Sequence, residues 1–569
     1  MSGVRPQSKL LPLHVFVDVA VLLGIGAVVY GLIDLSREWT GTLRPVAEIS
    51  LSPWALPRYT LFSLFRGFAA YLLSLAFTLV YGYIAAYNRR AEAVMVPALD
   101  ILQSIPVLGF LPGLVLALVA LFPRSNVGLE LACILMIFTG QVWNMTFSFY
   151  HSLRAIPAEL REAARVYRLS WWQRLTQLEL PYATVGLVWN SMMSMAGGWF
   201  FLTVCEAFVL GEKDFRLPGI GSFMSVAIQQ GNVPAMIWGV AAMIVMIVAV
   251  DQFVWRPIVA WSQKFKFEES EASVAAGSWV LDLLQKSYLL RWVDTKLWTP
   301  LVQWGEPRST VASRDRQGAL IGQGLGWAVA ALLVIAVGWG AMRLVQLLAQ
   351  LPGADWRRLG GLTGLTFLRV VAAVVIGSAW TIPVGVAIGL NPRLSRVLQP
   401  VIQIAASFPA PMVYPLVILA LKWAGVGINF GSVVLMMLGT QWYILFNVIA
   451  GAMAIPQELR EAAVVYRMSR WERWRRLILP GIFPHLVTGW VTATGGAWNA
   501  SIVAEYVHFG ADALTATGLG AMISVATDRG DFPMLAASVV LMCVTVVGIN
   551  RVVWQRLYRL AEDRFSLTK

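Results

Sequence analysis

Long apolar stretches are the feature that most limits how this chain can fold. Two of them, LVWNSMMSMAGGWFFLTVCEAFVL and AMIWGVAAMIVMIVAVDQFVW, each exceed the roughly 20 residues with which a helix crosses a bilayer. Only 13% of the 569 residues are charged, whereas 58% are hydrophobic. A soluble protein of this length needs far more charge to cover its surface. The sequence therefore predicts an all-α, polytopic membrane protein.

The positions of the apolar stretches predict a membrane span for each. If the N-terminus is cytoplasmic, most of the 44 Lys and Arg fall on the cytoplasmic side, which is the positive-inside bias of membrane proteins. The net charge of +13 then needs no nucleic acid partner. The even number of spans places both termini in the cytoplasm. The predicted spans are 14–36, 60–87, 95–122, 127–152, 182–210, 233–257, 319–348, 363–388, 397–423, 427–453, 481–508 and 532–555.

Two further features exclude simpler classes. The first apolar stretch is longer than the core of a signal peptide and contains Asp18, so we interpret it as an uncleaved span. The cysteines, Cys133, Cys205 and Cys543, all lie in predicted spans. Their spacing fits neither a disulfide framework nor a zinc site, and we expect no metal.

An internal repeat organises the chain. AIPAELREAARVYRLSWWQRLTQLELP at 155–181 and AIPQELREAAVVYRMSRWERWRRLILP at 454–480 agree at 18 of 27 positions, and weaker matches extend over both halves. Each half then holds six spans, and an even number gives both halves the same orientation. The repeat is therefore parallel, with a substrate path expected between the halves. The predicted parts are a first membrane half at 1–258, a cytoplasmic linker at 259–317 and a second membrane half at 318–569.

The linker contains a mixed stretch, SWVLDLLQKSYLLRWVDTKLW. It fits an amphipathic helix lying on the membrane surface, or a connection with no specific role.

A polar loop occurs in each half, at 154–181 and 453–480. Pro157 suits the first turn of a helix, and Ser170-Trp-Trp-Gln173 has the form of a capping box, which starts a second helix. Each loop is therefore predicted as helix, sharp turn and helix, ending at the proline where the next span begins. The loops keep acids and alanines, whereas topology needs only basic residues. We expect them to dock onto a soluble partner; loops that only set topology are the alternative.

These loops resemble the EAA motif of the membrane subunits of ATP-binding-cassette importers. The whole chain resembles two such permeases joined head to tail, most similar to the nitrate, sulfonate, taurine and bicarbonate permeases. Prolines nine positions apart before the third span of each half, and GGAWNASIVAEYV followed by GLG, support this group. The resemblance implies that the loops are coupling helices, held by residues Glu162, Ala163, Ala164, Tyr167, Arg168, Glu461, Ala462, Ala463, Tyr466 and Arg467.

The resemblance also implies partners and a location. Two cytoplasmic ATPase subunits are expected below the loops, and a periplasmic or lipid-anchored binding protein is expected to deliver a small anion. The chain is then a transporter subunit of a bacterial inner membrane and no enzyme. It has no GxxxxGK[ST] phosphate loop, so ATP and magnesium are expected on the ATPase, and no cofactor on this chain.

One position departs from the family pattern. The family usually has glycine six residues after the glutamate, where the loop turns, whereas this chain has Arg168 and Arg467. Glycine tolerates a positive φ, so we expect arginine to impose another turn geometry. The two arginines are candidate partners for acidic residues of the ATPase.

The substrate path has candidates that are polar or aromatic within apolar spans. An ionisable group in a span is by default a functional hypothesis, and prolines free backbone groups that can face a ligand. The glycines 197–198 and 495–496 fit close helix packing better than a helix break. We expect Arg66 and Arg369 to snorkel to the interface, with anion attraction as the alternative. The path candidates are Glu206, Glu505, Trp199, Trp498, Asn499, Gln103, Ser104 and Ser407.

Two other functions fit the same sequence. An ion-coupled secondary transporter also has twelve spans in two parallel halves, but the spans contain few central acids. The other alternative is a membrane scaffold that recruits soluble proteins through the two loops.

Overall fold

The computed structural model describes residues 48–210, 213–265, 278–287, 338–509 and 512–565, with positions 19, 22–23, 33–34, 39 and 335. The predicted spans 14–36 and 319–348 lie largely outside the described residues, as does most of the linker. In the described part, seven helices are long and apolar enough to cross a membrane, or eight if one bent pair counts as a span. The predicted all-α polytopic membrane fold is confirmed.

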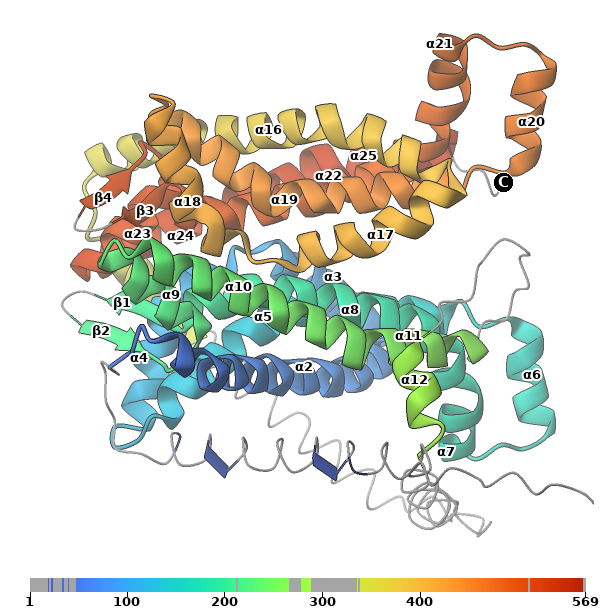
Figure 1. Cartoon of the computed structure of the whole chain (residues 1–569), viewed down its shortest axis with the longest axis horizontal. Coiled ribbons are helices and arrows are strands. Elements are labelled where there is room, and N and C mark those ends of the chain that lie inside the picture. The colour runs from blue at the N-terminus through green and yellow to red at the C-terminus, as the bar shows by residue number, and fades with distance from the viewer. Residues whose placement is uncertain are drawn as a thin grey trace, which may run out of the picture.

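The first half and the described part of the linker form one series of elements (Figure 1). These are η1 Pro53–Ala55, α2 Leu56–Tyr87, α3 Arg89–Ser104, η2 Val107–Phe110, α4 Leu111–Leu121, α5 Val127–Arg154, α6 Ala158–Val166, α7 Trp171–Arg174, η3 Leu175–Glu179, α8 Leu180–Cys205, β1 Ala207–Leu210, β2 Lys213–Arg216, α9 Ile220–Gln229, α10 Val233–Val250, η4 Asp251–Trp255, α11 Arg256–Ser262, η5 Gln263–Phe265 and α12 Trp279–Leu284.

The second half repeats this series. Its elements are α16 Gly353–Gly389, α17 Pro392–Ser407, α18 Ala410–Trp423, α19 Ile428–Met453, α20 Gln457–Val465, α21 Arg470–Arg473, η7 Trp474–Ile478, α22 Leu479–Ala504, β3 Tyr506–Phe509, β4 Asp512–Thr515, α23 Leu519–Arg529, α24 Phe532–Ile549, η8 Asn550–Trp554 and α25 Gln555–Phe565. The linker stretch predicted as an amphipathic surface helix begins at residue 278. Its start forms α12, and the part from 288 onward lies outside the described residues.

The core of each half is a layer of three long helices. In the first half α5 packs between α2 and α8, and in the second half α19 packs between α16 and α22. Small residues allow the close approach. A Cβ on Gly198 would lie 2.4 Å from the amide nitrogen of Gln141, and α8 runs unbroken through this position. Gly198 therefore serves helix packing rather than a helix break, whereas its neighbour Gly197 lies at the cavity.

The predicted third span of each half is not one straight helix. It is broken into α3 and η2–α4 in the first half, and into α17 and α18, bent by 87°, in the second. Ile105 and Phe408, at the two breaks, have ψ near 130°. Each precedes a proline, and a residue in that position is pushed out of the helical region by the proline ring. The second proline of each pair, Pro106 or Pro409, thus ends its helix, whereas Pro97 and Pro400 lie inside α3 and α17.

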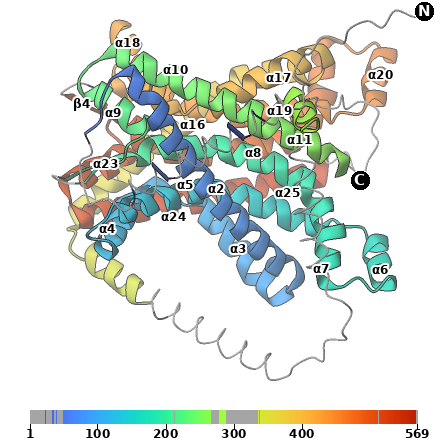
Figure 2. The ribbon, with the colours of Figure 1, turned by 60° about the horizontal axis from the view of Figure 1, so that its bottom comes forward.

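The broken helices join the two halves. α17 and α18 contact α8 of the first half, while α3 and η2 contact α24 of the second. Figure 1 shows the two halves side by side along their length, and in Figure 2 α17 of the second half lies beside α10 of the first, which it contacts. The interface is therefore built by each half placing its broken helix against the other.

The predicted fifth span of each half ends earlier than expected. α8 stops at Cys205 and α22 at Ala504, and each is followed by a short antiparallel hairpin, β1–β2 or β3–β4. A second short helix, α9 or α23, then returns toward the bundle. At the other end, α8 and α22 do not begin at Pro181 and Pro480. They continue from the loop helices α7 and α21 through π-helical turns. In each half, the second loop helix and the following span therefore form one continuous helix.

Candidate functional site

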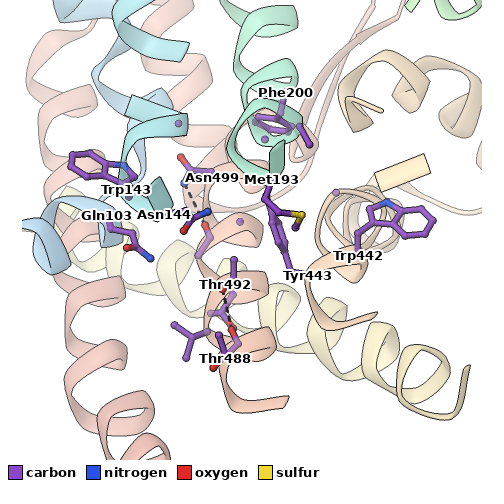
Figure 3. A pocket seen from close by; sticks show the side chains of 18 of the residues that line it. Gln103, Trp143, Asn144, Met193, Phe200, Trp442, Tyr443, Thr488, Thr492 and Asn499 are labelled. Atoms are coloured by element: carbon purple, nitrogen blue, oxygen red, sulfur yellow. Dashed lines mark hydrogen bonds between the residues drawn. The ribbon is translucent and has the colours of Figure 1, made fainter. Parts of the chain in front are cut away.

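A cavity of about 800 Å³ lies between the two halves. Its walls come from α5 and α8 of the first half, from α19 and α22 of the second, and from the broken segments of both. The pseudo-symmetric pairs Trp143/Trp442 and Phe147/Phe446 line it from the two halves. Figure 3 places Trp143 and Trp442 on opposite sides of this space. A defined space therefore lies between the halves, where the substrate path is expected.

The lining is neutral and rich in aromatic rings. Tryptophan, tyrosine and phenylalanine from both halves contribute to it, and its polar groups are amides, hydroxyls and His151. Among the described residues that line the cavity there is no Lys, Arg, Asp or Glu. The described ranges also hold no cluster of three or more His, Cys, Asp or Glu placed to bind a metal. The contacts that this wall offers are ring faces and hydrogen bonds from amides, hydroxyls and His151.

Three of the predicted path residues line the cavity, namely Gln103, Trp498 and Asn499. Trp199 and Ser407 line a much smaller neighbouring pocket of about 20 Å³. Trp199 packs on Gly67, whose Cβ would lie 2.8 Å from the indole. Ser104 ends α3, but its side chain lies outside the described atoms.

Asn499 connects the two halves at the cavity wall. Its Oδ1 accepts the backbone N–H of Val107, at 2.8 Å, across the interface. This N–H follows Pro106, where the helix is broken, and the asparagine satisfies it. In the repeat, Phe200 occupies the place of Asn499, so the two walls of the cavity differ in polarity.

Glu206 lies in a buried ion network rather than in the cavity. Its carboxylate accepts Arg66 Nη1–H at 2.8 Å, the Ser63 hydroxyl at 2.6 Å and the Gly221 N–H at 2.7 Å. Arg66 also donates two hydrogen bonds to Glu130, at 2.6 and 2.7 Å. Both ion pairs of Arg66 are fully buried. The network ties α2, α5, the end of α8 and the first turn of α9 together.

The second half has the matching network with one charge fewer. Arg369 donates to Glu505 at 2.8 Å, and its remaining donors reach the backbone and side-chain oxygens of Asn429. Asn429 occupies the place of Glu130 in the repeat. The expectation that Arg66 and Arg369 snorkel to the interface is wrong, because each is paired inside the bundle with the glutamate of its own half. A buried arginine needs such a partner.

The two polar loops form the predicted helix–turn–helix units. Ser170 and Ser469 each complete a capping box, with Gln173 and Glu472 as the reciprocal partners. Glu472 accepts the N–H of Ser469, which lowers the pKa of its carboxyl. The predicted second helix of each loop is thus confirmed, and it begins directly after the predicted capping serine.

The turn between the loop helices differs from the expectation. Arg168 and Arg467 have φ of 51° and 48°, the two positive values among non-glycine residues in the described chain. They therefore keep the left-handed conformation in which the family pattern has glycine, and the prediction of another turn geometry is wrong. The following N–H of Leu169 bonds to the carbonyl of Ala164, at 3.0 Å, which closes the helix in a Schellman motif.

The loop residues divide into an inner and an outer set. Ala164 and Ala463 are buried against the chain itself, and Ala163 and Ala462 are half-buried. The exposed set is Glu162, Tyr167, Arg168, Glu461, Tyr466 and Arg467. Tyr167 and Tyr466 leave 77% and 79% of their surface free.

Several cavity residues, and the pairing of Arg66 with Glu130, were not predicted from the sequence. Trp143, Asn144, Trp442 and Tyr443 line the cavity, and Arg66 with Glu130 builds the buried network. A signal was present for the tryptophans, since they occupy matched positions of the repeat. No sequence signal separated them from other aromatic residues in spans.

The sequence matches one protein family twice. The family is described as binding-protein-dependent transport system inner membrane component, and it matches residues 78–254 and 381–566. Similar curated proteins include the taurine transport system permease protein TauC of Escherichia coli (strain K12), 30% identical over 34% of this chain and 64% of that protein. The bicarbonate transport system permease protein CmpB of Synechococcus elongatus is 30% identical over 28% of this chain and 54% of that protein.

The nitrate import permease protein NrtB of Leptolyngbya laminosa is 24% identical over 32% of this chain and 60% of that protein. The chain thus spans between about half and two thirds of the length of these relatives. The two family matches together cover more than half of the chain, one in each half. This chain therefore belongs to the family of binding-protein-dependent transport system inner membrane components and carries two copies of its domain.

Proposed function

We propose that this chain is the membrane permease of an ATP-driven importer, with both halves of the translocation path in one polypeptide. The carrying observation is the pair of helix–turn–helix loops, α6–α7 and α20–α21, which project from the same end of the molecule (Figure 1). Their tips expose Val166 and Tyr167 in one loop, and Val465 and Tyr466 in the other. Exposed apolar surface rimmed by charge is typical of an interaction site.

The partners of the loops are two cytoplasmic ATPase subunits, one for each copy. Glu162 and Arg168 flank the apolar tip of the first loop, and Glu461 and Arg467 flank that of the second. Each tip therefore suits a groove that is apolar at its centre and charged at its rim. ATP and magnesium belong to the ATPases. α7 is continuous with α8, and α21 with α22. A movement of the ATPases that displaces a loop would therefore also displace the helix that lines the cavity.

The remaining parts of the proposal follow from the family. A periplasmic or lipid-anchored binding protein delivers a small solute at the opposite end, the loops and both termini are cytoplasmic, and the membrane is a bacterial inner membrane. The relatives' names concern taurine, bicarbonate and nitrate in three cases and riboflavin in another. A small anion is the solute class that most of these names suggest.

The test is co-purification of this chain with the ATPase encoded beside its gene. We expect two ATPase copies per chain and ATP hydrolysis by the complex. Glu162→Arg with Glu461→Arg should release the ATPases, because both glutamates are exposed on the loops. Asp355→Arg, at a partly exposed position in the first turn of α16 away from the loops, is the matched control and should leave the complex intact.

Failure to bind any ATPase by a well-folded chain would overturn the proposal. Proton-coupled uptake without an ATPase would then indicate the secondary transporter, and binding of soluble proteins without flux would indicate the scaffold. The cavity counts against ion coupling, since its described lining contains no carboxylate to carry a proton or a sodium ion.

A further inference from the structure

The chemistry of the cavity constrains the solute independently of the relatives' names. It holds about 800 Å³, within the range of roughly 300–1,000 Å³ that is usual for sites of drug-sized ligands. A water molecule occupies about 30 Å³ in the liquid. A four-atom anion would therefore fill on the order of a tenth of the space, and most of the wall would not touch it.

The electrostatics of the wall also disfavour a bare anion. Burying a charge is costly unless it is paired and hydrogen-bonded. The described lining offers no Lys or Arg, and its one histidine is His151. The arginines of the neighbouring networks, Arg66 and Arg369, are already bound to glutamates. The face of an aromatic ring carries negative quadrupole charge, so the ring faces of this wall repel anions.

The same wall suits a planar ring. Trp143 and Trp442 stand on opposite sides of the cavity (Figure 3), and Phe200 meets Phe201 at a ring distance of 5.4 Å on α8. Amide groups are placed among the rings. Gln103 and Asn144 both line the cavity, and Gln103 Oε1 is a buried acceptor with no hydrogen-bond partner in the described structure. The indole N–H of Trp143 is likewise unpartnered there.

We infer that the solute carried through this cavity is an uncharged organic molecule bearing a planar aromatic ring, held by ring stacking and by neutral amide hydrogen bonds. This inference rests on the proposed function. It replaces the small anion, as the solute class of the proposed importer, with neutral ring compounds. Trp143 and Trp442 are the stacking residues, and Gln103 and Asn144 are the polar ones.

The experiment uses two probes that match in size and differ in charge. Indole-3-acetamide is neutral at pH 7, indole-3-acetate is an anion, and nitrate serves as a small-anion probe. Binding of each radiolabelled probe to the full chain in lipid nanodiscs is measured by equilibrium dialysis, without an ATPase. We expect saturable binding of indole-3-acetamide. Binding of indole-3-acetate should be at least about tenfold weaker, because its carboxylate would be buried without a paired cation. Binding of nitrate should also be at least about tenfold weaker, because nitrate is charged and lacks the ring.

Variants separate the cavity from the rest of the chain. Trp143→Ala with Trp442→Ala should weaken indole-3-acetamide binding about tenfold. Trp189→Ala is the matched control, because Trp189 lies on α8, is 46% exposed and does not line the cavity. Asn144→Lys places a cation in the wall and should reverse the preference toward indole-3-acetate. All variants must elute as the unaltered chain does on gel filtration.

Three results would overturn the inference. They are no binding of indole-3-acetamide at millimolar concentration, anion binding as tight as that of the amide, and amide binding that survives the loss of both tryptophans. Because no ATPase is present, such a failure leaves the importer proposal to the co-purification test. If instead the chain bound the probe but no ATPase in that test, the ATP-driven mechanism would be rejected and the inference about the cavity would stand.

Discussion

Arg66 and Glu206 form an ion pair of 2.8 Å inside the first half, and neither side chain is exposed at all. Glu130 completes the network on the other edge of the guanidinium. The carboxylate of Glu206 also accepts the N–H of Gly221 in the first turn of α9, where the positive end of the helix favours an anion. The pair therefore fixes the short helix that follows the hairpin against α2.

Replacing Arg66 should destabilise the first half strongly. Arg66→Met leaves two buried carboxylates without their cation, and breaking a buried pair in this way costs about 3–5 kcal/mol. Arg369→Met should cost less, because Arg369 is 11% exposed and faces one glutamate and Asn429. Thermal unfolding of the chain in detergent measures both. Adding Glu130→Gln and Glu206→Gln to Arg66→Met should recover most of the loss, and equal effects of the two arginine variants would contradict the assignment.

Gly219 should not tolerate a side chain. A Cβ there would lie 2.3 Å from the carboxyl carbon of Glu206, and a Cβ on Gly518 would lie 2.2 Å from Glu505 Oε2. Gly219→Ala must therefore displace the buried carboxylate and lower the melting temperature. Gly113→Ala on α4 is the control, since nothing lies within 4 Å of a Cβ there. Alanine should stabilise that helix by up to about 1 kcal/mol.

The turn of each loop should be stabilised by glycine. Arg168 and Arg467 hold a left-handed conformation that costs a residue with a Cβ roughly 1–2 kcal/mol. Arg168→Gly and Arg467→Gly should therefore raise the protection of the loop amides in hydrogen exchange. Arg165→Gly, inside α6, should lower it instead, by the roughly 1 kcal/mol that glycine costs in a helix. If both glycine substitutions in the turns reduced protection, the turn would owe its stability to the arginine side chains.

The second loop should weaken in acid, and the first should not. The pKa of Glu472 is lowered in the folded loop because it accepts the N–H of Ser469. Its contribution is therefore present above the unfolded pKa of about 4.3 and is lost as the pH falls through the lower folded value. Gln173 fills the same place in the first loop and does not titrate.

Hydrogen exchange checks this asymmetry, after correction for the intrinsic pH dependence of exchange. Protection of the Ser469 cap should fall below about pH 4, while that of the Ser170 cap stays constant. Glu472→Gln should remove the pH dependence without removing the cap. Parallel loss of protection in both loops, or a pH response that survives Glu472→Gln, would show that another group is responsible.

Local sequence patterns predicted the loops well. The capping boxes at Ser170 and Ser469 involve groups three residues apart, so their chemistry is visible along the chain. The positive φ at Arg168 and Arg467 was missed for a related reason. Arginine rarely adopts that conformation, but here the two hydrogen bonds that close the helix end decide it over the side-chain preference.

The partners of charged residues in the spans could not be predicted in this way. Arg66 is 64 positions from Glu130 and 140 from Glu206, and only the packing of α2, α5 and α8 brings them together. The same holds for Val107 and Asn499, which lie 392 positions apart. Snorkelling is a sound expectation for a lone arginine, and the expectation failed because the folded bundle supplies its counter-ions.

The sequence by itself determined that this chain is a duplicated helical membrane protein with two helix–turn–helix loops. Span length, hydrophobicity and repeat spacing are properties of neighbouring residues, and they can be read without a fold. The tertiary structure alone decided which polar groups face the cavity and which are used in buried networks. That division depends on which helix faces meet, and α3 and α17, each broken before a proline, cross to the opposite half in a way that no local pattern specifies.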